Sequence, residues 1–278
     1  MRHSVTLVAS DQSLPVTELA RAVESRDLHG LWLPDHSHTP VARPDPLVRH
    51  GRHERMLDPV VGLAMASAAT ERIRVGTGVL LAGQRDPIAS AKALASIDQQ
   101  SAGRLAVGVG YGWDRDELAD HGIAMPERWE RMREHVLVMR RIWEDEVAEF
   151  HGRHVQLNPS ASWPKPMQHP LPLLLGAAPN PRTFGHIAEF GTGWIPRGGA
   201  GLHVHVPALR EAVAAAGRDP DELEVVSFSD GTCDDGKADH LERAGVTEVA
   251  YDVPFHEPPR VLDALDRIAL FVARRGRR

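Results

Sequence analysis

The sequence predicts a single (β/α)8 barrel, and three observations lead to this class. The chain has 278 residues, and one α/β barrel commonly needs about 250. Short β-type runs alternate with helical patterns from one end of the chain to the other, as in a parallel sheet. Eight such strands favour a closed barrel over the alternative of an open, doubly wound sheet. The hydrophobic fraction of 42% and the charged fraction of 25% are those of an ordinary globular protein.

Each expected strand is a short apolar run bounded by turn residues, and each expected helix has apolar residues three or four positions apart. The strands are expected at residues 5–8, 31–34, 73–81, 105–109, 172–175, 192–195, 223–228 and 246–253. The helices are expected at residues 16–25, 59–69, 88–99, 127–146, 183–190, 206–216, 237–244 and 260–273. In the long helix a stripe of large side chains predicts a face buried in the core. The stripe consists of Trp129, Met132, Val136, Met139 and Trp143.

Two stretches interrupt this alternation, and long loops in compact domains are commonly functional lids. Residues 37–57 form a polar loop after the second strand, rich in His, Pro and Arg. Residues 151–169 form another after the long helix, and 153–157 suit a hairpin strand. With no repeat or linker in the sequence, residues 1–278 are expected to form one domain with both loops over the barrel mouth.

Charge and cysteine content narrow the classes of partner. The net charge of −6 is spread along the chain, whereas nucleic acids and anionic membranes require a concentrated positive face. No apolar stretch reaches the 18 residues of a membrane-spanning helix. Cys233 is the single cysteine, so no internal disulfide is expected and a reducing, cytoplasmic location fits. We therefore expect no nucleic-acid partner and no membrane partner.

Unusual residues gather where the strands end, and in a barrel these carboxyl ends form one rim that holds the active site. The rim is expected to carry Asp35-His36, Gly76-Thr77-Gly78, the 108–113 run Gly-Val-Gly-Tyr-Gly-Trp, the 176–180 run Gly-Ala-Ala-Pro-Asn, and Arg197-Gly198. Glycine weakens a strand, so such clusters indicate backbone that passes close to a ligand. The spacing of Gly108, Gly110 and Gly112 is wrong for the dinucleotide fingerprint. A flat ring against bare backbone fits better, and glycines that only let barrel strands bend are the alternative.

Asn180-Pro181-Arg182 has the pattern of a helix start, with Asn as N-cap and Pro in the first turn. Free backbone N–H groups at such a start bind anions. Arg182 opposes the helix dipole unless an anion lies there. The sequence thus predicts a phosphate site, with a solvated arginine as the alternative.

Asp35 and His36 stand where a strand opens into a predicted lid, and a histidine can exchange a proton beside a hydride carrier. Three histidine pairs raise the question of a metal: His36/His38, His151/His154 and His203/His205. Metal-dependent barrel hydrolases carry His-x-His after the first strand, where this chain has Val8-Ala9-Ser10. No metal site is expected.

A run of spaced motifs resembles the luciferase-like monooxygenases, most of all the branch that uses the deazaflavin coenzyme F420. The motifs are the 72–79 run Arg-Ile-Arg-Val-Gly-Thr-Gly-Val, Arg85-Asp86-Pro87, Ala91-Lys92, Ile97-Asp98, Ser101-x-Gly103-Arg104-Leu105 and the 108–113 run. The 30–36 run Gly-Leu-Trp-Leu-Pro-Asp-His and Leu175-Gly176-Ala177 extend the resemblance to most of the chain.

The resemblance implies a ring over strands two to four and a phosphate toward strands five and six. Asp35 and His36 would lie near the reactive edge of the ring, and Gly78-Val79 matches the place of a non-prolyl cis peptide. Further cofactor contacts are expected from Leu80, Gly110, Gly112, Trp113, Gly176, Ala177, Ala178, Arg182, Arg197 and Gly198. Asp35 and His36 are the catalytic candidates, His36 as proton donor.

The sequence also departs from its F420-dependent sugar-phosphate relatives. They resemble it but carry a glutamate where this chain has Trp113, and their phosphate-binding lysines have no clear match. The leading hypothesis is therefore hydride transfer between F420 and another small organic substrate. An FMN-dependent monooxygenase using oxygen is the first alternative, and a non-catalytic cofactor-binding protein is the second. A second copy of the chain and a separate reductase are the candidate protein partners.

Overall fold

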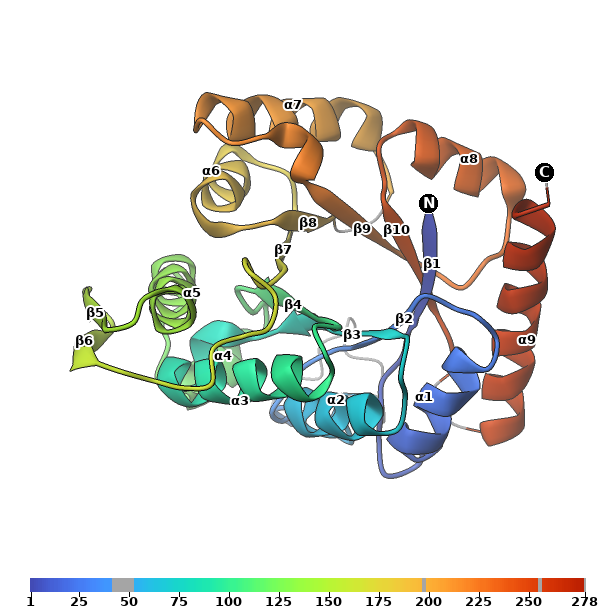
Figure 1. The fold of residues 1–278 in the computed structure, drawn as a ribbon, viewed down its shortest axis with the longest axis horizontal. Helices are drawn as coiled ribbons and strands as arrows, with labels where there is room; N and C mark the ends of the chain where they lie inside the picture. The colour runs from blue at the N-terminus through green and yellow to red at the C-terminus, as the bar shows by residue number, and fades with distance from the viewer. Residues whose placement is uncertain (42–52, 197–198, 255–256, 278) are drawn as a thin grey trace.

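The computed structural model describes residues 1–41, 53–196, 199–254 and 257–277 (Figure 1). Eight parallel strands close into a barrel in the order β1-β10-β9-β8-β7-β4-β3-β2, which confirms the predicted fold class. The strands are β1 Arg2–Thr6, β2 Gly30–Leu33, β3 Arg74–Leu80, β4 Leu105–Gly110, β7 Leu173–Ala177, β8 Gly193–Pro196, β9 Glu224–Ser229 and β10 Glu248–Asp252. The first strand begins at Arg2, earlier than expected, because Arg2 and its neighbours pair with β10.

Helices surround the barrel, as Figure 1 shows. They are α1 Val16–Glu24, α2 Pro59–Ala68, α3 Pro87–Gln100, α5 Arg128–Glu144, α6 Pro181–Phe190, α7 Leu202–Ala215, α8 Asp235–Arg243 and α9 Pro258–Arg275, with 3-10 turns η1 Ala82–Gln84 and η2 Pro220–Glu222. Several starts follow one rule, in which an Asp or Asn side chain caps the helix and proline follows it. Asp58, Asp86 and Asn180 each accept a hydrogen bond from a backbone N–H of the first turn.

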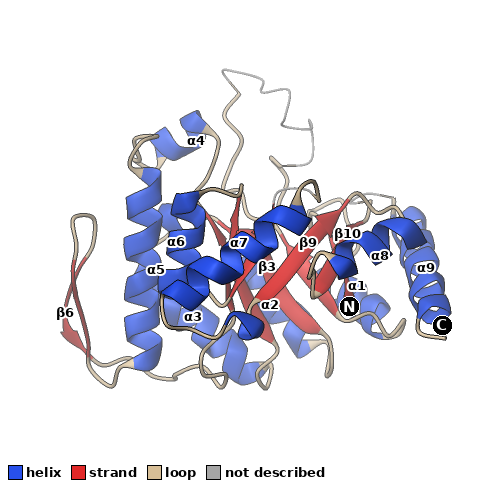
Figure 2. Cartoon of the chain, turned by 90° about the horizontal axis from the view of Figure 1, so that it is seen from above, coloured by secondary structure: helices blue, strands red, loops and turns tan. Residues whose placement is uncertain are grey.

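A short helix, α4 (Arg115–Asp120), follows β4 and was not predicted. It lies at the upper edge of Figure 2, beside the carboxyl ends of the strands. Asp114 caps it by accepting hydrogen bonds from the N–H groups of Asp116 and Glu117. Only Glu117 and Leu118 of this helix are buried, so its sequence has too little apolar periodicity to indicate a helix.

The stretch expected as a second lid, 151–169, does not cover the mouth. It contains most of a hairpin, β5 Ala148–His151 and β6 Gln156–Ser160, which lies outside α5 (Figure 2). Glu134 of α5 holds the hairpin turn, since its carboxylate accepts from the N–H groups of residues 153, 154 and 155. The chain then passes the amino end of β4, where the Gln168 amide donates to Leu105 O at 2.7 Å. Buried Asp98 fixes this path because it binds the N–H groups of residues 167 and 168.

The other expected lid, residues 37–57, is anchored at both ends near the mouth. Ser37 binds α4 through Glu117, and Leu57 N–H donates to Ala9 O, beyond the end of β1, at 2.9 Å. Residues 42–52 of this loop lie outside the described part of the chain.

The inside of the barrel is filled with side chains, apolar in the middle and ionic at the amino end. Trp32 is fully buried with Ala106, Leu174, Val226 and Ala250 around it. Below it the Trp32 indole N–H donates to Glu248 Oε1 at 2.7 Å, and Arg74 bridges Glu248 and Glu224. Any ligand of the barrel must therefore lie at the opposite, carboxyl end. No helix among the described residues is long and apolar enough to cross a bilayer.

Candidate functional site

A cleft of about 510 Å³ opens at the carboxyl ends of β3, β4, β7, β8 and β9. Its lining comprises Gly78, Val79, Leu81, the 110–113 run, Met125, Arg128, Trp129, Gly176, Ala177, Ala178, Asn180, Ile195, Pro196 and Phe228. Of the residues expected to bind a cofactor, the structure brings Gly78, Val79, Gly110, Gly112, Trp113 and Gly176 to Ala178 together here. The cleft is mostly apolar, with its polar and cationic groups at the edges.

The glycines of the cleft are required by the packing of the protein itself. The bond between Gly78 and Val79 is cis, as expected. A Cβ at Gly110 or at Gly176 would lie 2.6 or 2.5 Å from a methyl group of Val79, and a Cβ at Gly78 would overlap the Phe228 ring. Val79 is thus seated between two glycines and Phe228 lies over a third. These glycines make room for side chains that build the cleft floor. Neither a ring against bare backbone nor the bending of barrel strands, the two interpretations of the sequence, is therefore sufficient.

Gly112 turns the chain after β4. Its φ of +77° is left-handed, a conformation that side chains other than glycine rarely adopt. The turn leads Trp113 into the cleft wall, where its ring meets the edge of the His36 ring at a centroid distance of 5.7 Å.

A buried carboxylate holds the His36 ring in place. Its Nδ1 lies 2.9 Å from Oε2 of Glu117, whose side chain is fully buried. Burial alone would raise the pKa of Glu117, but the bonds and charge from His36 and the N–H of Ser37 lower it overall. Glu117 is therefore an anion at neutral pH, and it favours a proton on Nδ1 of His36, which leaves Nε2 for other partners.

Asp35 does not line the cleft. Its carboxylate accepts both Nε and a terminal nitrogen of Arg85, at 2.9 and 2.7 Å, and the N–H of Leu81 at 3.0 Å. Burial would lower the pKa of Arg85, but the bonds with Asp35 and the charge of Asp58 raise it overall. Asp35 is therefore fully engaged in holding the loop after β3, and its place in the structure gives no support to a role as a proton-transfer group.

The opposite end of the cleft lies at the start of α6. Asn180 caps this helix, with Oδ1 3.0 Å from the N–H of Thr183. Arg182 is exposed, and its guanidinium carbon lies 4.9 Å from the centre of the Trp129 ring. Arg128 lies on the same ring at 3.9 Å. This end of the site is cationic. Neither Arg182 nor His36 lines the cleft itself, since each contacts a tryptophan that does: Arg182 lies on Trp129 and His36 lies against Trp113.

The remaining predictions have mixed outcomes. Leu80 is fully buried in the core and does not line the cleft. Trp129 was expected in the core stripe but lines the cleft, whereas the other members of that stripe are buried. Arg197 and Gly198 lie outside the described residues. The described residues contain no group of three or more His, Cys, Asp or Glu side chains placed to hold a metal ion.

Sequence reasoning missed Glu117, Arg128 and Phe228, and it placed Tyr111 on the rim without giving it a role. A signal existed for Glu117, because Asp114 with Glu117 three residues later is typical of a helix start. Phe228 was visible only as the end of an apolar strand.

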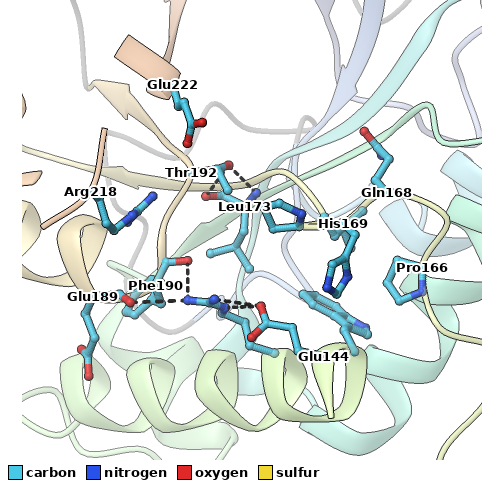
Figure 3. Close-up of a pocket in the computed structure, with 14 residues that line it drawn as sticks. Glu144, Pro166, Gln168, His169, Leu173, Glu189, Phe190, Thr192, Arg218 and Glu222 are labelled. Carbon is cyan, nitrogen blue, oxygen red and sulfur yellow. Dashed lines mark hydrogen bonds and ion pairs between the residues drawn. The ribbon is translucent and has the colours of Figure 1, made fainter. Parts of the chain in front are cut away.

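A second, smaller cavity of about 210 Å³ lies near the amino ends of β7 and β8 (Figure 3). Arg140 and Arg218 project into it, but both cations are in use. Arg140 donates to the carbonyls of residues 189 and 190, and Arg218 donates to those of 187 and 188. These are the last carbonyls of α6, so the two arginines cap that helix end.

The family model described as luciferase-like monooxygenase matches residues 2–271. The chain belongs to this family. An uncharacterized protein of Mycobacterium tuberculosis is 37% identical over 98% of this chain and 99% of its own length. An F420-dependent glucose-6-phosphate dehydrogenase of Kineococcus radiotolerans is 28% identical over 75% of this chain and 61% of its own. An FMNH2-dependent dimethylsulfone monooxygenase of Pseudomonas putida is 32% identical over 54% of this chain and 42% of its own.

Solved structures show the same fold. A monooxygenase of Streptomyces bottropensis superposes with a TM-score of 0.81 at 20% identity, covering 99% of this chain and 100% of its own. The F420-dependent tetrahydromethanopterin reductase of Methanopyrus kandleri superposes with 0.78 at 18%, covering 99% of both chains. The protein is thus a luciferase-like oxidoreductase, in a family whose relatives use either F420 or a flavin.

Proposed function

We propose that this luciferase-like protein is a coenzyme F420-dependent oxidoreductase that exchanges a hydride with a small organic substrate. One observation carries the proposal. The cleft has an apolar floor of Val79, Ile195 and Phe228, and a cationic end at α6. A cofactor with a flat aromatic ring and an anionic side chain matches this arrangement, with the ring over the apolar floor and the anion at the cationic end.

The residues present fit such a group. Gly176, Ala177 and Ala178 leave bare backbone next to the N-terminus of α6, where N–H groups and the helix dipole favour a phosphate. Arg182, in the first turn of that helix, adds a positive charge. When bound, the deazaflavin would supply the hydride carrier, and the protein would supply position and electrostatics.

His36 and Trp113 serve the other end in this proposal. Trp113 and Met125 line the cleft and exclude water from it. His36 exchanges a proton through Nε2, because Glu117 occupies Nδ1. Asp35, which was expected to be a catalytic residue together with His36, is assigned here to positioning, since Arg85 and Leu81 occupy its oxygens.

A sugar phosphate is not the proposed substrate. The three lysines of the chain are Lys92, Lys165 and Lys237. Lys92 and Lys165 bind backbone carbonyls on the outer side, and Lys237 pairs with Asp230. None of them lines the cleft, so no lysine is available there to bind a sugar phosphate, in line with the missing match to the lysines of the sugar-phosphate enzymes.

The test is an anaerobic titration of the purified protein with F420 and with FMN, followed by fluorescence. The proposal expects saturable binding of F420 with clearly weaker binding of FMN. It also expects bleaching of the F420 absorbance when an accepted alcohol donates a hydride, or recovery of that absorbance when reduced F420 donates a hydride to an accepted enone or imine. Tighter binding of FMN, with oxygenation of a substrate when reduced FMN and oxygen are supplied, would favour the monooxygenase alternative, for which the Pseudomonas relative is the precedent. Tight F420 binding without turnover on a panel of alcohols, enones and imines would favour a binding protein.

A further inference from the structure

Two arginines share one tryptophan at the cationic end of the cleft. The guanidinium carbons of Arg128 and Arg182 lie 3.9 and 4.9 Å from the centre of the Trp129 ring. They come from different helices, because Arg128 is the first residue of α5 and Arg182 the second of α6. Each also stands in the first turn of its helix, where the positive end of the dipole makes a further cation unfavourable. Two helix starts and two cations therefore face the same space.

Within the described part of the chain, no carboxylate compensates this charge. Among the residues that the structure describes, neither Arg128 nor Arg182 forms an ion pair. The two acids that flank Arg128 in the sequence are already engaged, since the N-cap residue Glu127 pairs with Arg153 at 3.0 Å and Glu130 of α5 pairs with Arg133 at 2.8 Å. Burial lowers the pKa of Arg128, and the charge of Arg182 lowers it further. The Nε of Arg128 is buried without a hydrogen-bond acceptor, which costs free energy unless a ligand supplies one.

Trp129 is a fixed platform for these groups. Its ring packs edge-on against Tyr111 at a centroid distance of 4.3 Å. The Tyr111 hydroxyl in turn lies 2.8 Å from Nδ1 of His186 on α6. The stack therefore joins β4, α5 and α6, and it keeps the arginines in place without an acidic partner. Both the platform and Arg128 line the cleft.

We propose that Arg128 and Arg182, stacked on Trp129, bind a second anionic group of the cofactor side chain, beyond its phosphate. This inference rests on the proposed function and sharpens it. One phosphate is satisfied by the start of α6, whereas the arginine pair offers charge for a carboxylate farther along the chain. FMN ends at a single phosphate, while F420 continues from its phosphate into a chain of carboxylates. The pair therefore selects for an oligo-anionic side chain.

The experiment measures the affinity of the full-length protein for deazaflavins with different tails by fluorescence titration. The probes are the deazaflavin riboside without phosphate, F420 with one glutamate, and F420 with several glutamates. We expect the affinity of the wild-type protein to rise with tail charge, by about two- to fivefold for each exposed ion pair gained. In Arg128→Gln and Arg182→Gln this rise should shrink, and in the double variant it should disappear, while the riboside binds unchanged.

Two control variants separate charge from folding. Arg141→Gln removes one cation near the far end of α5, where Arg141 pairs with Asp145, and it should keep the full dependence on tail length. Arg128→Lys preserves the charge and should keep most of the dependence of affinity on tail length. Thermal melting of each variant confirms that it is folded before titration.

The outcomes are distinct. Equal affinities for short and long tails in the wild-type protein would overturn the arginine proposal while F420 binding itself stands. The arginine proposal is also overturned if the affinity of the double variant still rises with tail length as in the wild-type protein. Failure of every F420 form to bind, with FMN bound, would overturn the proposed function and this inference with it.

Discussion

At the scale of single residues, the cleft floor is set by contacts between side chains and glycine backbone. Val79 fills the space that Cβ atoms at Gly110 and Gly176 would need, and Phe228 fills that of Gly78. The sequence showed glycines clustered at strand ends, which was enough to locate the rim. It could not show which side chain each glycine accommodates, because Val79 and Phe228 come from strands far apart in the chain.

Gly78→Val tests the floor. The added Cβ would overlap the Phe228 ring, so the ring must move into the cleft, and overpacking of this kind costs about 1–3 kcal/mol of folding stability. We expect F420 affinity to fall by at least tenfold, as measured by fluorescence titration. Gly185→Ala is the matched control, since a Cβ there meets nothing within 4 Å. It should leave binding unchanged and stabilise α6 by about 0.5–1 kcal/mol. Unchanged F420 affinity in Gly78→Val would show that the cofactor ring does not lie on this floor.

His3 gives a residue-scale prediction on pH. Burial, with the charges of the N-terminus and Arg275, lowers the pKa of His3 from 6.5 to about 4. Between these values the unfolded chain binds a proton that the folded protein does not, so the free energy of unfolding decreases as pH falls. His3→Phe keeps the stacking against Tyr251, which lies 5.9 Å away between ring centroids. Melting temperatures from pH 7 to 4.5 should fall less steeply in this variant. An identical slope would mean that His3 titrates normally in the folded protein.

At the scale of elements, α4 and residues 36–38 form one unit at the mouth. Besides the pair of His36 with Glu117, His38 Nε2 lies 2.9 Å from Asp120 Oδ2, and the Ser37 hydroxyl lies 2.7 Å from His121 Nε2. Histidines thus take part in most of the side-chain contacts between this segment and α4.

Glu117→Gln tests this unit. An amide can accept from Ser37 but no longer offers Nδ1 of His36 an anionic acceptor, so we expect α4 to stay folded while the proposed proton exchange at His36 is impaired. On the proposed function, kcat with F420 and an accepted substrate should drop by at least tenfold with little change in KM. Hydrogen exchange at residues 114–121 reports whether the helix remains docked. Asp120→Asn, at the exposed contact with His38, is the control and should change kcat by less than about twofold. If both variants behave alike, Glu117 has only a structural role.

Most elements were predictable because the strands are apolar runs between turn residues and the helices carry apolar residues three or four positions apart. The eight strands and the helices around them were identified within a few residues. Two errors have physical causes. The α4 helix lacks an apolar stripe, since it buries only two residues. The stretch 151–169 is polar like a lid, but buried Asp98 and Glu134 bind its backbone away from the mouth. The sequence cannot show that an acid in one helix will bind N–H groups more than 15 residues away.

At the scale of the whole molecule, an ionic network fills the amino end of the barrel. Arg74 donates to both Glu224 and Glu248, and Arg2 also binds Glu224. Glu248 is fully buried and also accepts from Ser4 and Trp32. This arrangement joins the first strand to the last two.

Arg74→Met removes the central cation and leaves two carboxylates close together. Breaking a buried pair on one side commonly costs about 3–5 kcal/mol, so we expect a loss of this order in urea unfolding. Against the effect of burial, Arg74 helps to hold the pKa of Glu224 below its usual value, so part of the loss should be recovered at low pH as Glu224 takes up a proton. Arg72→Met, at a side chain that is 65% exposed, should cost less than about 1 kcal/mol. A loss in Arg74→Met no greater than in Arg72→Met would show that solvent already screens the network.

The packing of Val79 between two glycines also limits how the cleft floor can change during evolution. Positions 79, 110 and 176 share one small volume, so a bulkier residue at either glycine is tolerated only if residue 79 shrinks in the same lineage. Conversely, alanine at 79 would deepen the floor without touching the rim. The dimensions of the cleft floor are therefore adjustable through one side chain, while the strands that carry it stay the same.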